Sequence, residues 1–330
     1  MIVTVTPNPS LDRTLEVAQL VRGEVLRADA RRVDPGGKGI NVARALHAFG
    51  HRVRAVLPSG GHEGDHLVAL IEDAGLDPVV VPVDGPVREN VAIVEPDGTV
   101  TKVNEPGPRF DDAVAEALLA ATAEAASEAR WVVGSGSLPP GAPVDLYAQL
   151  VRRVRDRGCR VAIDTSGDPL AAAVDAGPDL VKPNHDELAA LTGVAVRTFG
   201  DVVSAARTLL ERGVGTALVS LGPDGALLVD REGVLHAERS VEAPRSTVGA
   251  GDATLAGYLS AADADRATAL RTAVAFGAAA VSLPGSQMPG PADVKPDLVA
   301  LDDRPALDRA LVTGLWLGAV SASQEPQPTP

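Results

Sequence analysis

The sequence predicts an α/β fold, with a doubly wound, mostly parallel sheet and a small β-lid beside it. From residue 111 onward, helical segments alternate with short strands made almost wholly of apolar residues. That pattern is typical of a parallel sheet covered by helices on both faces. Two hairpin-like segments, residues 11–35 and 86–105, interrupt the alternation and are predicted to form the lid. We assign the rest of the chain to one main domain, which consists of residues 1–10, 36–85 and 106–320.

The first part of the chain contains strands, turns and two helices. Residues 2–6 are a β-branched run that predicts a buried strand. Gly36 and Gly37 precede a helix predicted over residues 40–49, where apolar positions recur at helical spacing, and Gly50 ends it. The further elements expected here are a strand at 52–57, a helix at 65–74, a strand at 79–83, and hairpin strands at 87–94 and 99–103.

The second part of the chain is more regular. A long alanine-rich helix is predicted after residue 111. The later elements expected in chain order are strand 131–133, helix 145–157, strand 160–163, strand 180–181, helix 185–192, helix 201–212, strand 217–220 and helix 253–262. Residues 321–330 are polar and proline-rich, cannot bury an apolar face, and are predicted to be a disordered tail.

Composition excludes several classes of function. The formal net charge is −14, and a surface this acidic repels nucleic acid and anionic membranes. Cys159 is the single cysteine, so no internal disulfide can form. No apolar run has the length of a membrane span and no signal-peptide pattern opens the chain, so we expect a cytoplasmic protein. His62 and His66 are spaced as a helical pair, but Gly64 is expected to interrupt that helix, so no metal site is predicted there.

The motif with the clearest chemistry is Ser-Thr-Val-Gly-Ala-Gly-Asp at residues 246–252, just before a predicted helix. Glycines let the backbone approach an anion, and the N–H groups at a helix start attract negative charge. Gly249, Ala250, Gly251 and Asp252 could therefore stabilise a phosphoryl group in transfer, with Asp252 accepting the proton of an attacking hydroxyl. The alternative is structural: the glycines form a turn and Asp252 caps the helix.

This segment resembles the second signature of the pfkB (ribokinase-like) family of carbohydrate kinases. The first signature is similar to residues 35–45, Pro-Gly-Gly-Lys-Gly-Ile-Asn-Val-Ala-Arg-Ala, and the family's Asn-x-x-Glu motif is similar to residues 182–187. The three motifs follow the family's order, and the resemblance covers about residues 1–295. It implies a ribokinase-like fold and an ATP-dependent kinase that uses ATP and Mg²⁺.

Four shorter segments resemble one branch of that family, the 1-phosphofructokinases and tagatose-6-phosphate kinases. They are residues 8–12, 88–90, 102–108 and 134–141. The resemblance implies that a ketohexose phosphate is phosphorylated, with fructose 1-phosphate converted to fructose 1,6-bisphosphate as the first expectation. The alternatives left open are a 6-phosphofructokinase, a tagatose-6-phosphate kinase and a sugar-phosphate-binding regulator without turnover.

The resemblance also implies a sugar-phosphate site. Asp12 and Asn41 would bind sugar hydroxyls, because a carboxylate accepts from a hydroxyl and an amide both donates and accepts. Arginine and lysine match phosphate oxygens, although each such cation alone is more often a solvated surface charge. The remaining expected substrate-binding residues are Gly36 and Gly37 near the ring, Arg88, Lys38 and Arg27 at the phosphate, and Ser137.

The nucleotide and metal sites are implied in the same way. Lys182 would reach the ATP phosphates, and Asn184 and Glu187 would hold Mg²⁺ largely through water, which suits an ion that keeps several waters. Ser220, Gly222 and Gly225, after an apolar strand, resemble the nucleotide-contacting loop of the family. The alternatives are a helix cap for the Asn-x-x-Glu pair and a simple strand–turn–strand for the loop. The exposed lid edges predict a homodimer formed through the lid.

Overall fold

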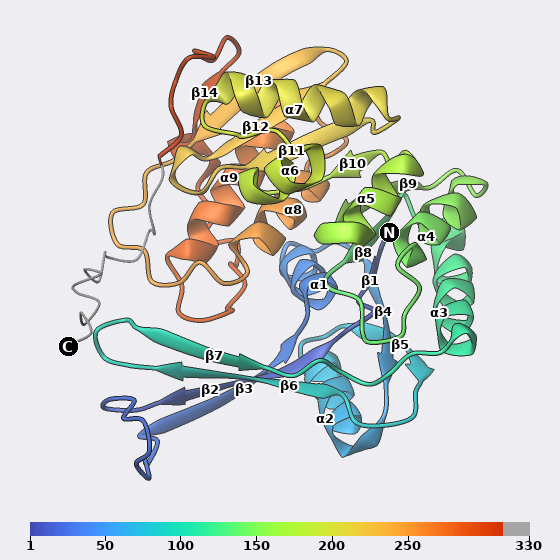
Figure 1. Ribbon diagram of the computed structural model, residues 1–330, viewed down its shortest axis with the longest axis vertical. Coiled ribbons are helices and arrows are strands. Elements are labelled where there is room, and N and C mark those ends of the chain that lie inside the picture. The colour runs from blue at the N-terminus through green and yellow to red at the C-terminus, as the bar shows by residue number, and fades with distance from the viewer. Residues whose placement is uncertain (313–330) are drawn as a thin grey trace, which may run out of the picture.

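The computed structural model describes residues 1–312 of the chain. This part forms a ten-stranded sheet with helices on both faces and a separate four-stranded sheet at one side (Figure 1). The predicted α/β fold, a mostly parallel sheet with a small additional β-sheet, is confirmed. The predicted tail at 321–330 and the end of the predicted main domain at 313–320 lie outside the described residues.

The large sheet has the strand order β14-β13-β12-β11-β10-β9-β8-β1-β4-β5. The strands from β5 to β11 in this order are parallel, whereas β12, β13 and β14 add antiparallel pairs at one edge. Their bounds are β1 Ile2–Val5, β4 Val53–Ser59, β5 Asp77–Pro82, β8 Trp131–Ser135, β9 Arg160–Asp164, β10 Leu180–Val181, β11 Thr216–Ser220, β12 Ala226–Asp230, β13 Gly233–Glu238 and β14 Ala300–Asp302.

Two apolar cores separate the sheet from its two helix layers. Neighbouring strand residues point to opposite cores, as Ile2 and Val3 do, which explains why these strands are apolar without alternation. One layer contains α1 Lys38–Ala48, α2 Gly61–Asp73, α8 Ala250–Ser260 and α9 Arg266–Val281. The other contains α3 Asp112–Ala125, α4 Leu146–Arg155, α5 Gly167–Asp175, α6 His185–Thr192 and α7 Phe199–Glu211. Within residues 1–312, no helix is both long and apolar enough to cross a membrane.

The small sheet is built from the two segments that interrupt the main alternation. Its order is β3-β2-β6-β7, with bounds β2 Ser10–Glu16, β3 Ala30–Gly36, β6 Arg88–Val94 and β7 Val100–Asn104. The pairing places Asp12, Asn90 and Asn104 in one row across the sheet, on one face. The next row holds Val33, Arg13, Val91 and Val103 on the opposite face, where Arg13 forms an ion pair with Glu89. One face of this sheet is therefore polar, and the other is mostly apolar with one ion pair.

One local expectation was wrong. Helix α2 begins at Gly61 and continues through Gly64, which therefore does not interrupt it. A Cβ on Gly64 would collide with the Ser59 hydroxyl, so the missing side chain allows α2 to pack closely on the end of β4. His62 and His66 are both exposed, and no group of three or more potential metal-ligating side chains occurs among residues 1–312.

Candidate active site

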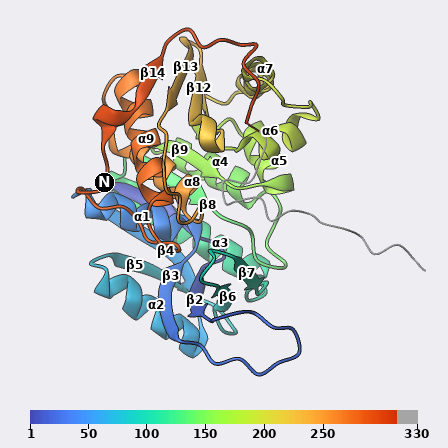
Figure 2. The ribbon, with the colours of Figure 1, turned by 90° about the vertical axis from the view of Figure 1, so that its left-hand side faces the viewer.

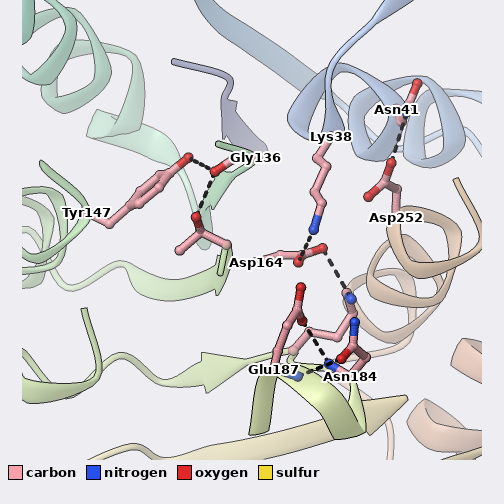
Figure 3. Close-up of polar contacts among 10 residues, drawn as sticks. Lys38, Asn41, Gly136, Tyr147, Asp164, Asn184, Glu187 and Asp252 are labelled. Atoms are coloured by element: carbon pink, nitrogen blue, oxygen red, sulfur yellow. Dashed lines mark hydrogen bonds and ion pairs between the residues drawn. The ribbon is translucent and has the colours of Figure 1, made fainter. Parts of the chain in front are cut away.

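The predicted chemical residues meet where parallel strands end and two helices begin. Lys38 is the first residue of α1, and Asp252 lies in the first turn of α8. Asp164 is the last residue of β9, and Lys182 directly follows β10 (Figure 3). Carboxyl ends of parallel strands are the usual location of ligand sites in open α/β sheets. Segments separated by more than 200 residues in the sequence, as Lys38 and Asp252 are, thus form one site.

A buried carboxylate joins the two lysines. Lys38 Nζ donates to Asp164 Oδ1 at 2.9 Å, and Lys182 Nζ lies 3.3 Å from Asp164 Oδ2 as an ion pair. Burial acts to raise the pKa of Asp164, but the ammonium groups of Lys182 and Lys38 outweigh it and the pKa is lowered. The same contact raises the pKa of Lys38 above its ordinary value. Asp164 and Lys38 are therefore both charged at neutral pH.

Asp252 is buried and hydrogen-bonded to Asn41. Asn41 Nδ2 donates to Asp252 Oδ2 at 2.9 Å (Figure 3). Burial, with the negative charge of Asp164 as the second cause, raises the pKa of Asp252 to about 6. Lys38, the Asn41 hydrogen bond and Lys182 act in the opposite direction. A carboxylate with a pKa near 6 is mostly ionised at neutral pH, yet far more basic than an ordinary aspartate.

The start of α8 has the features of an anion site. Gly249 is the N-cap with φ 77°, a conformation that favours glycine, and a Cβ there would lie 2.6 Å from Met288. The N–H groups of Gly251 and Asp252 have no backbone acceptor in the described part of the chain. A Cβ on Gly251 would lie 3.0 Å from Lys182 Nζ, so an ammonium group adjoins the same helix end. Backbone donors and a lysine thus face one small space.

A cleft of about 280 Å³ adjoins this helix start. Ala250 and Gly251 line it, and its wall also includes four of the five predicted nucleotide-side residues, Asn184, Ser220, Gly222 and Gly225, but not Lys182. Arg239 lines the cleft as well and was not anticipated from the sequence. Its Nη1 is buried without a partner within the described residues. The cleft therefore combines an apolar interior with polar groups near the α8 start, as a nucleotide site requires.

Asn184 and Glu187 form a capping box at the start of α6. Asn184 Oδ1 accepts from the Glu187 backbone N–H at 2.8 Å, and Glu187 Oε2 accepts from the Asn184 N–H at 2.9 Å. The helix-capping interpretation of this motif is therefore correct as far as these contacts go. Glu187 Oε1 makes no hydrogen bond to residues 1–312, so one carboxylate oxygen remains for a ligand.

A second and larger cleft, of about 750 Å³, which we call the sugar cleft, lies between the polar face of the small sheet and loops of the main domain, and of the predicted sugar-side residues Asp12 alone lines it within the described part of the chain. Asp12 accepts from Ser10 Oγ at 2.8 Å and from Asn90 Nδ2 at 2.9 Å. A Cβ on Gly36 would collide with the Asp12 carboxyl group, so only glycine fits beside it. Gly37 has φ 115° and leads directly into α1. These predicted residues are thus adjacent.

The three other predicted substrate-binding residues differ in position. The Arg88 guanidinium donates to the backbone carbonyls of Glu105 and Asn8, each at 3.1 Å, while its buried Nε has no partner in residues 1–312. Ser137 is exposed and accepts from Asn8 Nδ2 at 3.3 Å, which connects it to Arg88. Arg27 is exposed on the loop between β2 and β3 and is not brought to this cluster.

Sequence reasoning missed Asp164 and its surroundings. Thr165 Oγ1 and Tyr147 OH both donate to the Gly136 carbonyl, at 2.8 and 2.9 Å, beside Asp164 (Figure 3). The available signal was position: Asp164 is a carboxylate at the carboxyl end of an apolar strand, next to a lysine-bearing strand end. In a chain with 44 acidic residues that signal is weak, because most such residues are solvated.

Comparison with known proteins agrees with this geometry. The model of the pfkB family of carbohydrate kinases matches residues 6–293, so the chain belongs to that family. A 1-phosphofructokinase from Xanthomonas campestris pv. campestris is 40% identical over 283 residues, covering 83% of this chain and 89% of the relative. The ATP-dependent 6-phosphofructokinase isozyme 2 of Escherichia coli is 37% identical over 284 residues, covering 85% and 91%.

Solved structures give the same result. The crystal structure of a possible 1-phosphofructokinase from Thermotoga maritima superposes with a TM-score of 0.84 at 30% identity, covering 91% of this chain and 98% of that one. The family resemblance carried by the three sequence motifs and the ribokinase-like fold that it implied are both confirmed. The chain is thus a carbohydrate kinase by family.

Proposed function

We propose that this chain transfers the γ-phosphoryl group of ATP to a ketohexose phosphate, with fructose 1-phosphate as the first-choice substrate and fructose 1,6-bisphosphate as the product. One observation carries the proposal: a buried, Asn41-bonded Asp252 of raised pKa lies at an open helix start beside the Lys38–Asp164–Lys182 cluster. The names of the similar proteins support it, because 1-phosphofructokinases are among those most similar over most of the chain.

In the proposed reaction, Asp252 accepts the proton of the acceptor hydroxyl while the hydroxyl oxygen forms a bond to the γ-phosphorus. The bond from that phosphorus to the β–γ bridging oxygen breaks, and ADP leaves with that oxygen. The free N–H groups of Gly251 and Asp252 and the ammonium of Lys182 face the charge that develops on the phosphoryl oxygens. Burial of these groups strengthens their effect, since little water screens them.

The same residues fit a magnesium ion. Mg²⁺ keeps several waters and needs few carboxylates, and Glu187 retains one oxygen without a hydrogen bond in the described residues. We propose that Glu187, with Asn184 through water, holds the ion. When bound, it would neutralise part of the phosphate charge.

For the sugar phosphate, we propose that Asp12 and Asn41 bind hydroxyls and that the backbone of Gly36 and Gly37 lies near the ring. Arg88 and Lys38 supply positive charge for the phosphate already on the sugar, with Ser137 as a further contact. Burial lowers the pKa of Arg88, while the nearby Asp12 carboxylate acts to raise it, so the two side chains interact electrostatically. In a chain of net charge −14, a dianionic substrate requires such a local basic group.

We propose further that the small sheet is a lid and that two copies of the chain pair through it, mainly by residues 11–35 and 86–105. The polar face of the sheet lines the sugar cleft, so its apolar face points elsewhere. On that apolar face Val103 is 59% exposed, and Val33 and Val91 are partly exposed. A second copy that covers this face would remove the apolar surface from water. Closure of the lid would exclude water from the transferred group.

The closest alternatives share the site and differ in substrate: fructose 6-phosphate or tagatose 6-phosphate. The deciding experiment is an assay of ADP release over a panel of free and phosphorylated ketohexoses. We expect fructose 1-phosphate to give the highest kcat/KM. A preference for free sugars would contradict the sugar-phosphate assignment but leave the kinase assignment, and binding of sugar phosphate without any ADP release would favour a regulator.

A further inference from the structure

The last described segment of the chain crosses the nucleotide side of the molecule. After β14, residues 303–312 run over the edge of the large sheet to the start of α7 (Figure 2). The Phe199 backbone N–H donates to the Arg309 carbonyl at 2.9 Å, and the Leu311 N–H donates to the Arg197 carbonyl at 2.9 Å. Leu311 is buried in the core on that face. We call residues 303–312 the C-terminal strap.

Arg309 is the side chain by which the strap reaches the sheet edge. Its Nη2 donates to Asp224 Oδ1 at 2.8 Å and to Glu238 Oε2 at 2.7 Å. The guanidinium lies over the Phe199 ring, 4.8 Å from its centroid. The hydrogen bond to Glu238, helped by Asp224, raises the pKa of Arg309, so the group stays protonated. One arginine thus connects the strap, α7 and β13 to Asp224.

Asp224 is buried, and its polar atoms are held from several directions. Besides Arg309, the Val312 backbone N–H donates to Asp224 Oδ2 at 2.7 Å. His236 Nε2 donates to the Asp224 carbonyl at 2.7 Å. A buried carboxylate requires such partners, because an unpaired charge in the interior is costly. Val312 and Arg309 both belong to the strap, so the strap supplies every hydrogen bond and ion pair that the Asp224 carboxylate makes within residues 1–312.

Asp224 is also part of the nucleotide loop. It ends the short 3-10 helix Gly222–Asp224, between the two glycines that line the nucleotide cleft. Gly225 has φ 76°, and a Cβ there would collide with the Ala237 carbonyl, so the loop rests directly on β13. The shape of the cleft wall at this loop therefore depends on the loop backbone. The hydrogen bonds of the Asp224 side chain to the strap hold that backbone in place.

We propose that Arg309 is a positioning residue for nucleotide binding: through Asp224 it holds the loop at residues 220–225 in the shape that lines the cleft. Arg309 does not line the cleft itself. Without its guanidinium, the buried carboxylate of Asp224 has lost its counter-ion, and arrangements of the loop that expose Asp224 to water become favourable. The loop is then a mixture of conformations, and a nucleotide binds only the competent one. The apparent dissociation constant equals the intrinsic one divided by the fraction of the chain that is competent.

The inference rests on the proposed kinase function, but its test needs no sugar. The dissociation constant of ADP with Mg²⁺ is measured by isothermal titration calorimetry for the wild-type chain, Arg309→Ala and Arg304→Ala. Arg304 is the matched control, because it lies in the same strap with a side chain that is 91% exposed. If the competent loop falls to about one fifth to one tenth of the population, Arg309→Ala raises the ADP dissociation constant about fivefold to tenfold. Arg304→Ala leaves it unchanged.

A purely structural role would give a different result. Arg309→Ala would then lower the melting temperature, but the folded protein would still bind ADP with wild-type affinity. That result overturns the proposal. Circular dichroism at the assay temperature verifies that the variant is folded. Arg309→Lys restores a cation and should recover affinity. If Arg309→Ala does not fold, Arg309→Gln replaces it as the variant without the charge, and wild-type ADP affinity in folded Arg309→Gln overturns the proposal equally. A wild-type chain that binds ADP but phosphorylates no sugar phosphate refutes the proposed substrate and leaves this inference standing. A wild-type chain that binds no ADP refutes both.

Discussion

The raised pKa of Asp252 makes a quantitative prediction about pH. If Asp252 is the proton acceptor, turnover requires its ionised form and is lost as the pH falls through about 6. With that pKa, about 90% of the group in the free chain is ionised at pH 7 and about 10% at pH 5, so kcat/KM falls about tenfold between these values. An aspartate of ordinary pKa 3.8 would remain almost fully ionised at pH 5, and kcat/KM would hardly change.

The hydrogen bond from Asn41 provides a way to move this midpoint. It stabilises the charged form of Asp252, so its loss raises the pKa further. A hydrogen bond to a charged group contributes about 1.5 kcal/mol, and about 1.4 kcal/mol equals one pKa unit. Asn41→Ala should therefore shift the midpoint of kcat/KM upward by about one unit, from near pH 6 to near pH 7.

The assay must separate Asp252 from the substrate, because a phosphate monoester also titrates near pH 6. Asn90→Ala is the control, since Asn90 lies in the sugar cleft and bonds to Asp12 and Ser10 rather than to Asp252. ADP formation is measured directly by chromatography of quenched samples, at sugar-phosphate concentrations well below KM and at constant ionic strength, from pH 4.5 to 8.5. The substrate's own titration is common to all three proteins, so the difference between the two variants isolates Asp252.

Two results would refute the reasoning. The first is a wild-type kcat/KM that stays constant down to pH 5, which would mean that no group of the free chain with a pKa near 6 controls turnover. The second is the same midpoint for Asn41→Ala and Asn90→Ala, which would mean that the titrating group is not the one that Asn41 contacts. Lower absolute rates in either variant are expected, because both asparagines lie in the proposed sugar site, and they do not affect the comparison.

Four further predictions concern the site and the assembly. Asp252→Asn should lower kcat by roughly 10² to 10⁴ while sugar-phosphate binding measured by calorimetry stays near wild type; kcat within threefold of wild type would contradict the assignment. Folding raises the pKa of Asp252 from 3.8 to about 6, so ionisation of this group destabilises the folded chain by about 3 kcal/mol above pH 6. This cost vanishes below pH 3.8, where the group is protonated in both states. Asp252→Asn should therefore raise the melting temperature at pH 7 but not at pH 4. Arg88→Ala should raise KM for the sugar phosphate about 10- to 100-fold with KM for ATP unchanged, and equal changes in both would argue against a phosphate contact. Light scattering should show a dimer that Val103→Glu converts to a monomer, whereas a monomeric wild type at micromolar concentration would exclude the lid interface.

The parts of the molecule that the sequence predicted well are those with local causes. The end of α1 follows from Gly50, the start of α6 from the capping box at Asn184 and Glu187, and the end of α6 from Gly193. The all-apolar strands predicted the parallel sheet because both of their faces are buried. The anion site was predictable for the same reason, since glycine spacing and a helix start lie within one short segment, residues 246–252.

The parts that it did not predict depend on contacts between distant segments. Asp164 is separated from Lys38 by 126 residues, and Arg309 from Asp224 by 85. No local pattern distinguishes such carboxylates from solvated ones, and only the strand order brings them to their partners. Gly64 shows the converse error: the local rule that glycine interrupts a helix was overridden because its missing side chain allows close packing on Ser59.

The arrangement of charge in the site bears on how proton and phosphoryl transfer are linked. Lys38 and Lys182 carry two positive charges, and Asp164 and ionised Asp252 carry two negative ones, so the four groups sum to zero before any phosphate enters. A phosphoryl group that approaches the α8 start adds negative charge near Asp252 and competes with Asp164 for Lys182. Both effects raise the pKa of Asp252 further, since a like charge approaches and a stabilising cation is drawn away. The affinity of Asp252 for a proton is therefore greatest when the phosphoryl group is in place, which is when the attacking hydroxyl must lose one.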